Sequence, residues 1–306
     1  MRCVLHVGMP KAGSTSIQLC LGRERQLVRD MGIAPRQFVG GFANDYALYQ
    51  KVVAVDRDGI STYLAGLRRD AEAAGARLVF LTSEMFFTLP PERGGFPVLL
   101  EEMSRHFEEV RIIIVVRNLR SFMRSYLRQL IDNGALLLHD DQLAVWFVER
   151  LWAFWTLPVD VVTVSFDLAV GDKKLLTRFF HVVAGTNRLV PEVVENATPS
   201  RPLAFMAMRG VIARLVAARH GIHVNSSVVD QARTGVSEDF DRIVRISEDP
   251  LLITRTLDEI SQSLGEEIEK YIDHCISLVS VDRMRLYERC VMSDLSENEF
   301  TGLALP

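Results

Sequence analysis

The chain lacks several features that would narrow its class at once. In 306 residues it has no run of about 18 uncharged apolar residues, so we expect no membrane span. Its N-terminus reads as a strand and lacks the basic region followed by an apolar region that marks an export signal. There are only four cysteines, none in a C-x-x-C pair, and no cluster of Cys, His or Asp has metal-binding spacing. These absences predict a reduced, cytoplasmic protein that uses no metal.

The chain also has little excess charge. The net charge is -4, which predicts no general attraction to nucleic acid, so a bound anion must be held by local positive charge. Hydrophobic residues make up 48% of the sequence, enough for a large core. The length is typical of one α/β domain with additions.

Apolar runs alternate with helical patterns over the first two thirds of the chain, which predicts a parallel sheet with helical crossovers. The expected strands are Cys3–Val7, Leu78–Thr82, Ile112–Val116 and Val161–Phe166. The expected helices are Ser14–Met31, Ile60–Ala74, Val98–Phe107, Leu119–Ile131, Leu143–Trp155, Lys173–Val183, Pro202–Arg219 and Ile253–Ile276. We therefore expect a three-layer α/β fold with a mainly parallel sheet and a helical C-terminal addition, while Val224–Glu248 has no clear pattern.

The loop after the first expected strand has the composition of an anion site. It contains Gly8 and Gly13 at the spacing of a nucleotide-triphosphate loop, but serine stands where that loop has lysine, and the lysine is Lys11. A glycine-containing loop that leads into a helix offers backbone N–H groups and the positive end of the helix dipole. The alternative is an ordinary helix cap at Ser14, which leaves Lys11 unexplained.

A second basic cluster lies at the end of the third expected strand. Arg117 ends that strand, and Arg120, Arg124 and Arg128 follow at intervals of four on one helix face, with no acidic residue before Asp132. For Arg120 and Arg128 we favour a solvated face. Arg117 stands where ligands of such sheets bind, and arginine can hold a phosphate by two parallel hydrogen bonds.

These two motifs resemble those of sulfotransferases that use 3′-phosphoadenosine 5′-phosphosulfate, in particular the bacterial or glycan-type branch. "PKAGSTS", residues 10–16, is similar to the family's 5′-phosphosulfate loop, P-K-x-G-[ST]-[ST], and "RNLRSFMRS", residues 117–125, is similar to its 3′-phosphate motif. The resemblance covers residues 1–200 and includes "VDVVTVSFDLAVGDKKLLTRFF", whereas the match of Glu195–Pro202 to a loop near the nucleotide is weak. The resemblance to the sulfotransferases implies a P-loop-like nucleotide site. The residues implied to bind the donor are Lys11, Ala12, Gly13, Ser14, Thr15, Ser16, Arg117 and Ser125.

The stretch "LTSEMFF", residues 81–87, resembles the region in which glycan-type members carry a glutamate base. Glu84 would be that base, with Lys11 as the other catalytic residue. The alternative is that Ser83 caps a short helix and Glu84 complements its dipole. A histidine remains an alternative base: His6 reads better as a core residue, and His106 and His139 have no distinguishing context.

The resemblance implies transfer of a sulfonate group to a hydroxyl acceptor, either a sugar, a glycolipid or another aliphatic alcohol, with adenosine 3′,5′-bisphosphate as product and no metal. We expect one sulfotransferase domain over residues 1–306, with a nucleotide-binding core in 1–190 and the acceptor side in 191–306. Two alternatives remain open: a kinase-like phosphotransferase, against which the missing G-K-[ST] counts, and a non-catalytic nucleotide-binding protein.

Overall fold

The computed structural model describes residues 1–36, 43–133, 141–171, 174–186, 189–191, 202–219, 238, 242 and 250–292. Two segments noted in the sequence, Glu195–Pro202 and Val224–Glu248, lie largely outside these residues, and so does His139. The chain divides into two compact units. The first contains residues 1–118, 146–197 and 280–306, and the second contains 119–145 and 198–279.

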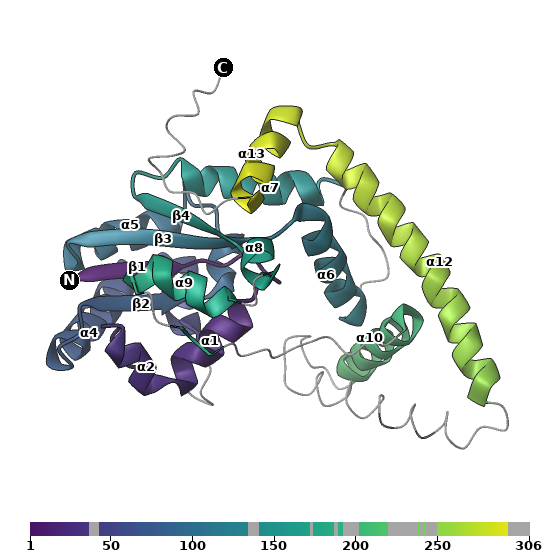
Figure 1. Ribbon diagram of the computed structural model, residues 1–306, viewed down its shortest axis with the longest axis horizontal. Coiled ribbons are helices and arrows are strands. Elements are labelled where there is room, and N and C mark those ends of the chain that lie inside the picture. Colours follow the sequence, from purple (N-terminus) through teal and green to yellow (C-terminus); the bar gives the residue numbers. More distant parts are fainter. Residues whose placement is uncertain are drawn as a thin grey trace. The chain divides into compact units, whose positions relative to one another are not determined.

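The first unit has an α/β fold built on a four-stranded, all-parallel sheet with the strand order β2-β1-β3-β4 (Figure 1). The strands are β1 (Arg2–His6), β2 (Leu78–Thr82), β3 (Glu109–Val116) and β4 (Asp160–Ser165). All four predicted strands are confirmed to within a few residues. Each is almost wholly buried towards its C-terminal end because helices cover the sheet, which explains the continuous apolar runs.

Helices of this unit lie on both faces of the sheet (Figure 1). They are α1 (Ser14–Arg23), α2 (Arg25–Asp30), α3 (Tyr46–Val53), α4 (Arg57–Ala73), the 3-10 helix η2 (Glu84–Thr88), α5 (Gly95–His106), α7 (Leu143–Trp155, from residue 146 on), α8 (Phe166–Gly171), α9 (Leu175–Ala184) and α13 (Val281–Met292). The ring of Phe179 on α9 contacts those of His6 and Phe80 on one face. On the other face, Phe96 of α5 contacts Phe154 of α7.

Several details differ from the sequence prediction, and one of them is that the helix α3 was not predicted. The expected helix Ser14–Met31 is divided at Glu24 into α1 and α2. Phe166, expected at the end of a strand, begins α8. The helix α13 was not predicted, although it packs on β4 within the sheet-containing unit. Among the described residues no helix is both long and apolar enough to cross a bilayer.

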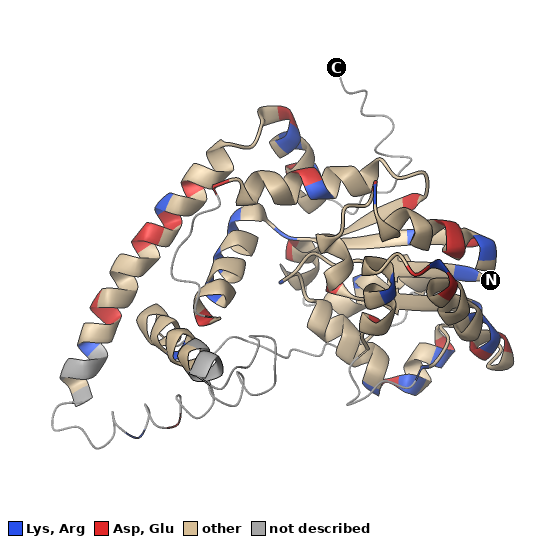
Figure 2. Cartoon of the chain, turned by 180° about the vertical axis from the view of Figure 1, so that it is seen from behind, with Lys and Arg blue, Asp and Glu red and all other residues tan. Residues whose placement is uncertain are grey.

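The described part of the second unit is helical. Its described helices are α6 (Leu119–Asp132), α10 (Leu203–Arg219) and α12 (Pro250–Ser277), which pack on one another. The basic face of α6 meets acidic residues of α12 (Figure 2): Arg124 Nε lies 2.5 Å from Glu269 Oε1, and Arg120 pairs with Glu269 and Asp273. Arg120 is therefore ion-paired, but its side chain is still 40% exposed, and Arg128 is exposed, as expected of a solvated face. That both units act as one sulfotransferase domain stays a prediction.

Candidate functional site

The strand order places a topological switch point between β1 and β3 at the C-terminal edge of the sheet. From β1 the chain proceeds to β2 on one side, and from β3 it proceeds to β4 on the other, so the loops after β1 and β3 diverge. Ligands of open parallel sheets bind at such switch points. The candidate residues Lys11 and Arg117 follow these two strands, and Glu84 follows β2, the other neighbour of β1.

The loop after β1 is compact and partly strained. Gly8, Lys11 and Gly13 have left-handed backbones, with φ of 62°, 63° and 83°. A Cβ at Gly8 would lie 3.0 Å from Ser14 Oγ and 3.2 Å from Glu84 Cα, so this glycine lets the loop approach both residues. Lys11 is not a glycine, and a left-handed residue with a side chain persists only where its surroundings hold it.

The first turn of α1 presents backbone donors next to this loop. Gly13 is the N-cap, without a side-chain cap, and the first-turn bond runs from the Ile17 N–H to the Gly13 carbonyl at 3.3 Å. The preceding N–H groups have no place in the helix ladder. The Ser14 hydroxyl is buried and has no hydrogen-bond partner among the described residues. The alternative that Ser14 caps the helix is therefore wrong.

The charge of Lys11 acts on the ionisation of Glu84. Burial raises the pKa of the Glu84 carboxyl above its ordinary value, and the positive charge of Lys11 opposes the rise. Ser83 occupies the N-cap of η2 but makes no side-chain cap bond, so the capping part of the alternative interpretation is wrong. Glu84 does lie in the first turn of η2, but the dipole of so short a helix stabilises a carboxylate only weakly.

A buried ion pair holds the end of β2, from which Glu84 projects. The Asp45 carboxylate accepts hydrogen bonds from the Thr82 N–H at 2.8 Å, from Tyr63 Oη at 2.7 Å and from Arg36 Nη1 at 3.0 Å. Because Asp45 is 1% exposed, its partners must replace the water it has lost. This network fixes the backbone two residues before Glu84.

Arg117 joins the two loops. Its Nη1 donates to the Lys11 carbonyl oxygen at 3.1 Å, and its guanidinium lies 5.0 Å from the centre of the Phe166 ring. Burial lowers the pKa of Arg117, and Asp167 opposes that shift. The Nε of Arg117 is buried without a hydrogen-bond partner among the described residues, so it retains a donor for a ligand.

Ser125 is placed differently from the other candidates. It is half-buried on α6, in the second unit, whereas Arg117 belongs to the first, so each is described only within its own unit. Lys11, Gly13, Thr15 and Ser16 are half-buried, and Ala12 is buried. The structure therefore brings together Lys11, Ser14, Glu84 and Arg117, and the predicted pairing with Ser125 stays a prediction.

His6 belongs to the core, as the sequence suggested. It is fully buried, its Nδ1 lies 2.9 Å from Thr82 Oγ1, and burial lowers its pKa to about 3. His106, at the end of α5, lies 2.9 Å from Ser61 Oγ. Neither position supports a role as the base.

Tyr287 is a residue of the site that sequence reasoning missed. Its hydroxyl donates to the Arg117 carbonyl oxygen at 2.7 Å from the unpredicted helix α13. The partners are 170 residues apart in the chain, so no local pattern could have connected them. Asp167 was also missed: its carboxylate accepts from the Asn118 N–H at 2.5 Å.

A separate groove of about 650 Å³ runs along α5 and the segment before β4, with Pro97, Leu100, Leu157 and Pro158 in its lining. None of the predicted site residues lines this groove. All four cysteines are free and buried. Within the described ranges, no three His, Cys, Asp or Glu side chains come together as a metal site.

Comparison with known proteins gives no match for this chain among protein-family models, curated proteins or solved structures.

Proposed function

We propose that this chain transfers a sulfonate group from 3′-phosphoadenosine 5′-phosphosulfate to a hydroxyl acceptor. The observation that carries the proposal is the close packing of Glu84 and Ser14 against Gly8, in the loop that contains Lys11 and leads into α1. A cation and a carboxylate with a raised pKa are the two groups that an in-line transfer to a hydroxyl requires. The motif resemblance supplies the identity of the donor.

The loop suits a phosphosulfate for three reasons. Gly8 and Gly13 carry no side chain, so the loop packs closely against Ser14 and Glu84 on one side and against Leu175 on the other, which holds its shape. The N–H groups at the start of α1 and the helix dipole favour an anion. The Ser14 hydroxyl is a buried donor without a partner among the described residues, and a bound oxyanion would satisfy it.

The donor supplies an activated sulfur, and the residues of this chain handle the charge and the proton. The acceptor oxygen forms a bond to sulfur as the bond from sulfur to the bridging oxygen breaks. Lys11 and the loop N–H groups stabilise the negative charge that develops on the bridging oxygen. Glu84 accepts the hydroxyl proton; its burial raises its basicity, while Lys11 favours the ionised form.

The binding of the 3′-phosphate rests on the resemblance, which assigns it to Arg117 and Ser125. The unpartnered Nε of Arg117 supports the first assignment. A carboxylate base favours a sugar, glycolipid or other aliphatic alcohol over a phenol as the acceptor. The helical region 191–306 remains the proposed acceptor side.

The proposal can be tested by incubating the protein with the labelled donor and three acceptor classes: glycans, aliphatic alcohols and phenols. We expect transfer to a glycan or an aliphatic alcohol without added metal. Magnesium-dependent turnover of ATP, with no sulfonate transfer, would instead identify a phosphotransferase. Tight binding of adenosine 3′,5′-bisphosphate without any turnover would identify a nucleotide-binding protein.

A further inference from the structure

The helix α13 brings one hydroxyl to both loops of the candidate site. Tyr287 is 2% exposed, and its Oη donates to the Arg117 carbonyl oxygen at 2.7 Å and lies 3.4 Å from the sulfur of Met9. Met9 belongs to the loop after β1, and Arg117 follows β3. Tyr287 therefore contacts the loop after β1 and the loop after β3 at once.

A second hydrogen bond continues from Arg117 to the lysine. The backbone of Arg117 accepts from Tyr287, and the side chain of Arg117 donates to the carbonyl oxygen of Lys11 at 3.1 Å. Lys11 has a φ of 63°, a conformation that costs a non-glycine residue about 1–3 kcal/mol and needs support from its surroundings. The two hydrogen bonds supply such support from a helix far away in the sequence.

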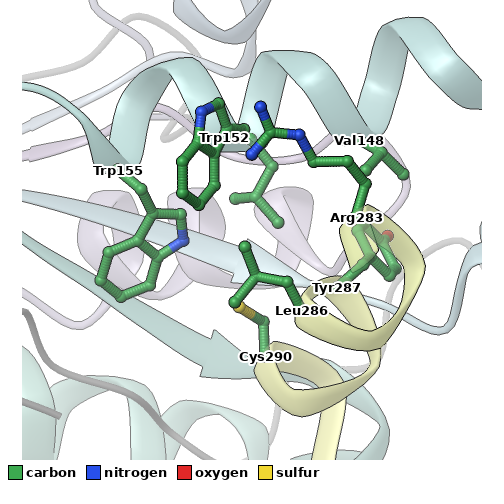
Figure 3. A pocket seen from close by; sticks show the side chains of 8 residues that line it. Val148, Trp152, Trp155, Arg283, Leu286, Tyr287 and Cys290 are labelled. Carbon is green, nitrogen blue, oxygen red and sulfur yellow. The ribbon is translucent and has the colours of Figure 1, made fainter. Parts of the chain in front are cut away.

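The helix is anchored by contacts that do not involve the Tyr287 hydroxyl. The guanidinium of Arg283 lies over the Trp152 ring of α7, 3.9 Å from its centre (Figure 3). Arg283 Nε also forms an ion pair with Glu149 at 3.1 Å. Near the other end of α13, the carbonyl oxygen of Val291 accepts from the Ser165 hydroxyl of β4. The hydroxyl can thus be removed while these anchors remain.

Burial raises the pKa of Tyr287 well above its ordinary value. The phenol therefore stays protonated at neutral pH and remains a hydrogen-bond donor. A carbonyl oxygen that loses such a donor inside the protein is left without a partner, which favours movement of the backbone that carries it.

We propose that Tyr287 is a positioning residue of the donor-binding loop: its hydroxyl fixes the backbone of Arg117 and, through the Arg117 side chain, the left-handed conformation of Lys11. The identity of the ligand rests on the proposed function, whereas the control of the loop does not.

The test compares Tyr287→Phe, which removes only the hydroxyl, with Arg283→Gln, which weakens an anchor of α13 without touching either loop. Amide hydrogen exchange is measured by mass spectrometry on the protein without ligand, in peptides that cover residues 7–16 and 115–119. Peptides from β1 and β4 report global opening and serve as the internal reference. We expect both loop peptides to exchange about 3- to 10-fold faster in Tyr287→Phe alone, the factor that corresponds to one neutral hydrogen bond.

A ligand measurement gives the second readout. The dissociation constant of adenosine 3′,5′-bisphosphate should rise by about 3- to 10-fold in Tyr287→Phe and stay at the wild-type value in Arg283→Gln. Unchanged exchange in both loops, or an equal increase in Arg283→Gln, would overturn the role of Tyr287. If the wild-type protein does not bind this ligand, the proposed function fails, and the exchange comparison still decides whether Tyr287 controls the loop.

Discussion

Replacing Glu84 by glutamine separates a catalytic role from a structural one. The substitution Glu84→Gln keeps the size of the side chain but removes the basic oxygen. General-base catalysis contributes about 10²–10⁴ in rate, so we expect kcat to fall by at least about 100-fold, which corresponds to about 2.7 kcal/mol of activation free energy. The affinity for the donor should change little, because Lys11 and Arg117 remain. The assay is steady-state sulfonate transfer with the donor as the varied substrate.

The same variant has a stability signature with a defined sign. Burial raises the pKa of Glu84 in the folded protein, so the folded state binds the proton more tightly than the unfolded chain does. The ionised carboxylate therefore lowers the free energy of unfolding at neutral pH, and this cost is absent below the unfolded pKa of 4.5. Glu84→Gln should be as stable as the wild type or more stable at pH 7.5, and this advantage should disappear in acid. Urea denaturation at several pH values measures it.

The pH dependence of the rate provides the third readout. The wild type should show an acidic limb in kcat, at a pH above the ordinary range of a carboxyl group, and Glu84→Gln should lack it. Glu92→Gln is the matched control, because Glu92 is exposed shortly after η2 and should leave the rate and the profile unchanged. Full activity of Glu84→Gln with an unchanged acidic limb would refute the assignment. A loss of a few tenths of a kcal/mol in stability at full rate would show that Glu84 serves only its helix.

Three further substitutions test the surrounding residues. Lys11→Ala should nearly abolish kcat, because the negative charge that Lys11 stabilises is larger in the transition state than in the bound donor. The protein should stay folded, since alanine keeps a Cβ at this left-handed position. Near wild-type turnover would remove Lys11 from the mechanism. Arg117→Ala should weaken the binding of adenosine 3′,5′-bisphosphate by about 1.5–3 kcal/mol, and that of adenosine 5′-phosphosulfate by less. Calorimetry measures both binding free energies. Equal losses would mean that Arg117 acts only through its bond to Lys11. Burial lowers the pKa of His6 to about 3 in the folded protein, against 6.5 for the free group. The folded state therefore keeps His6 neutral, and the free energy of unfolding that depends on this is fully present above pH 6.5 and is lost as the pH falls towards 3. His6→Asn should therefore reduce the loss of unfolding free energy between pH 7.5 and 4.5 by about 2–3 kcal/mol, and an unchanged loss would contradict the assigned cause.

Local sequence patterns determined much of the first unit. The apolar runs that became β1 to β4 are continuous because both faces of the sheet are covered, and this makes them readable without knowledge of the neighbours. The loop at Lys11 and the end of the strand at Arg117 were also recognisable, because glycines, hydroxyls and cations at strand ends form short contiguous motifs.

Other features depend on residues that are distant in sequence. A solvated face was expected for Arg120 and Arg128, and only the fold shows that α12 supplies Glu269 as a partner for Arg120, 149 residues later in the chain. Similarly, Ser14 and Ser83 have the composition of helix caps, yet neither side chain caps its helix. A cap is a matter of side-chain geometry, and composition alone cannot determine it.

The sequence by itself determined the order of the strands along the chain and the chemistry at their ends, because propensity and periodicity act over a few residues. Tertiary structure alone decided that β1 lies between β2 and β3, which brings Glu84 and Arg117 to opposite sides of Lys11. It also decided that Tyr287 reaches Arg117 from the C-terminal helix. Such contacts arise when separate segments bury their apolar faces against a common sheet, and the sequence of one segment does not determine which other segment it packs against.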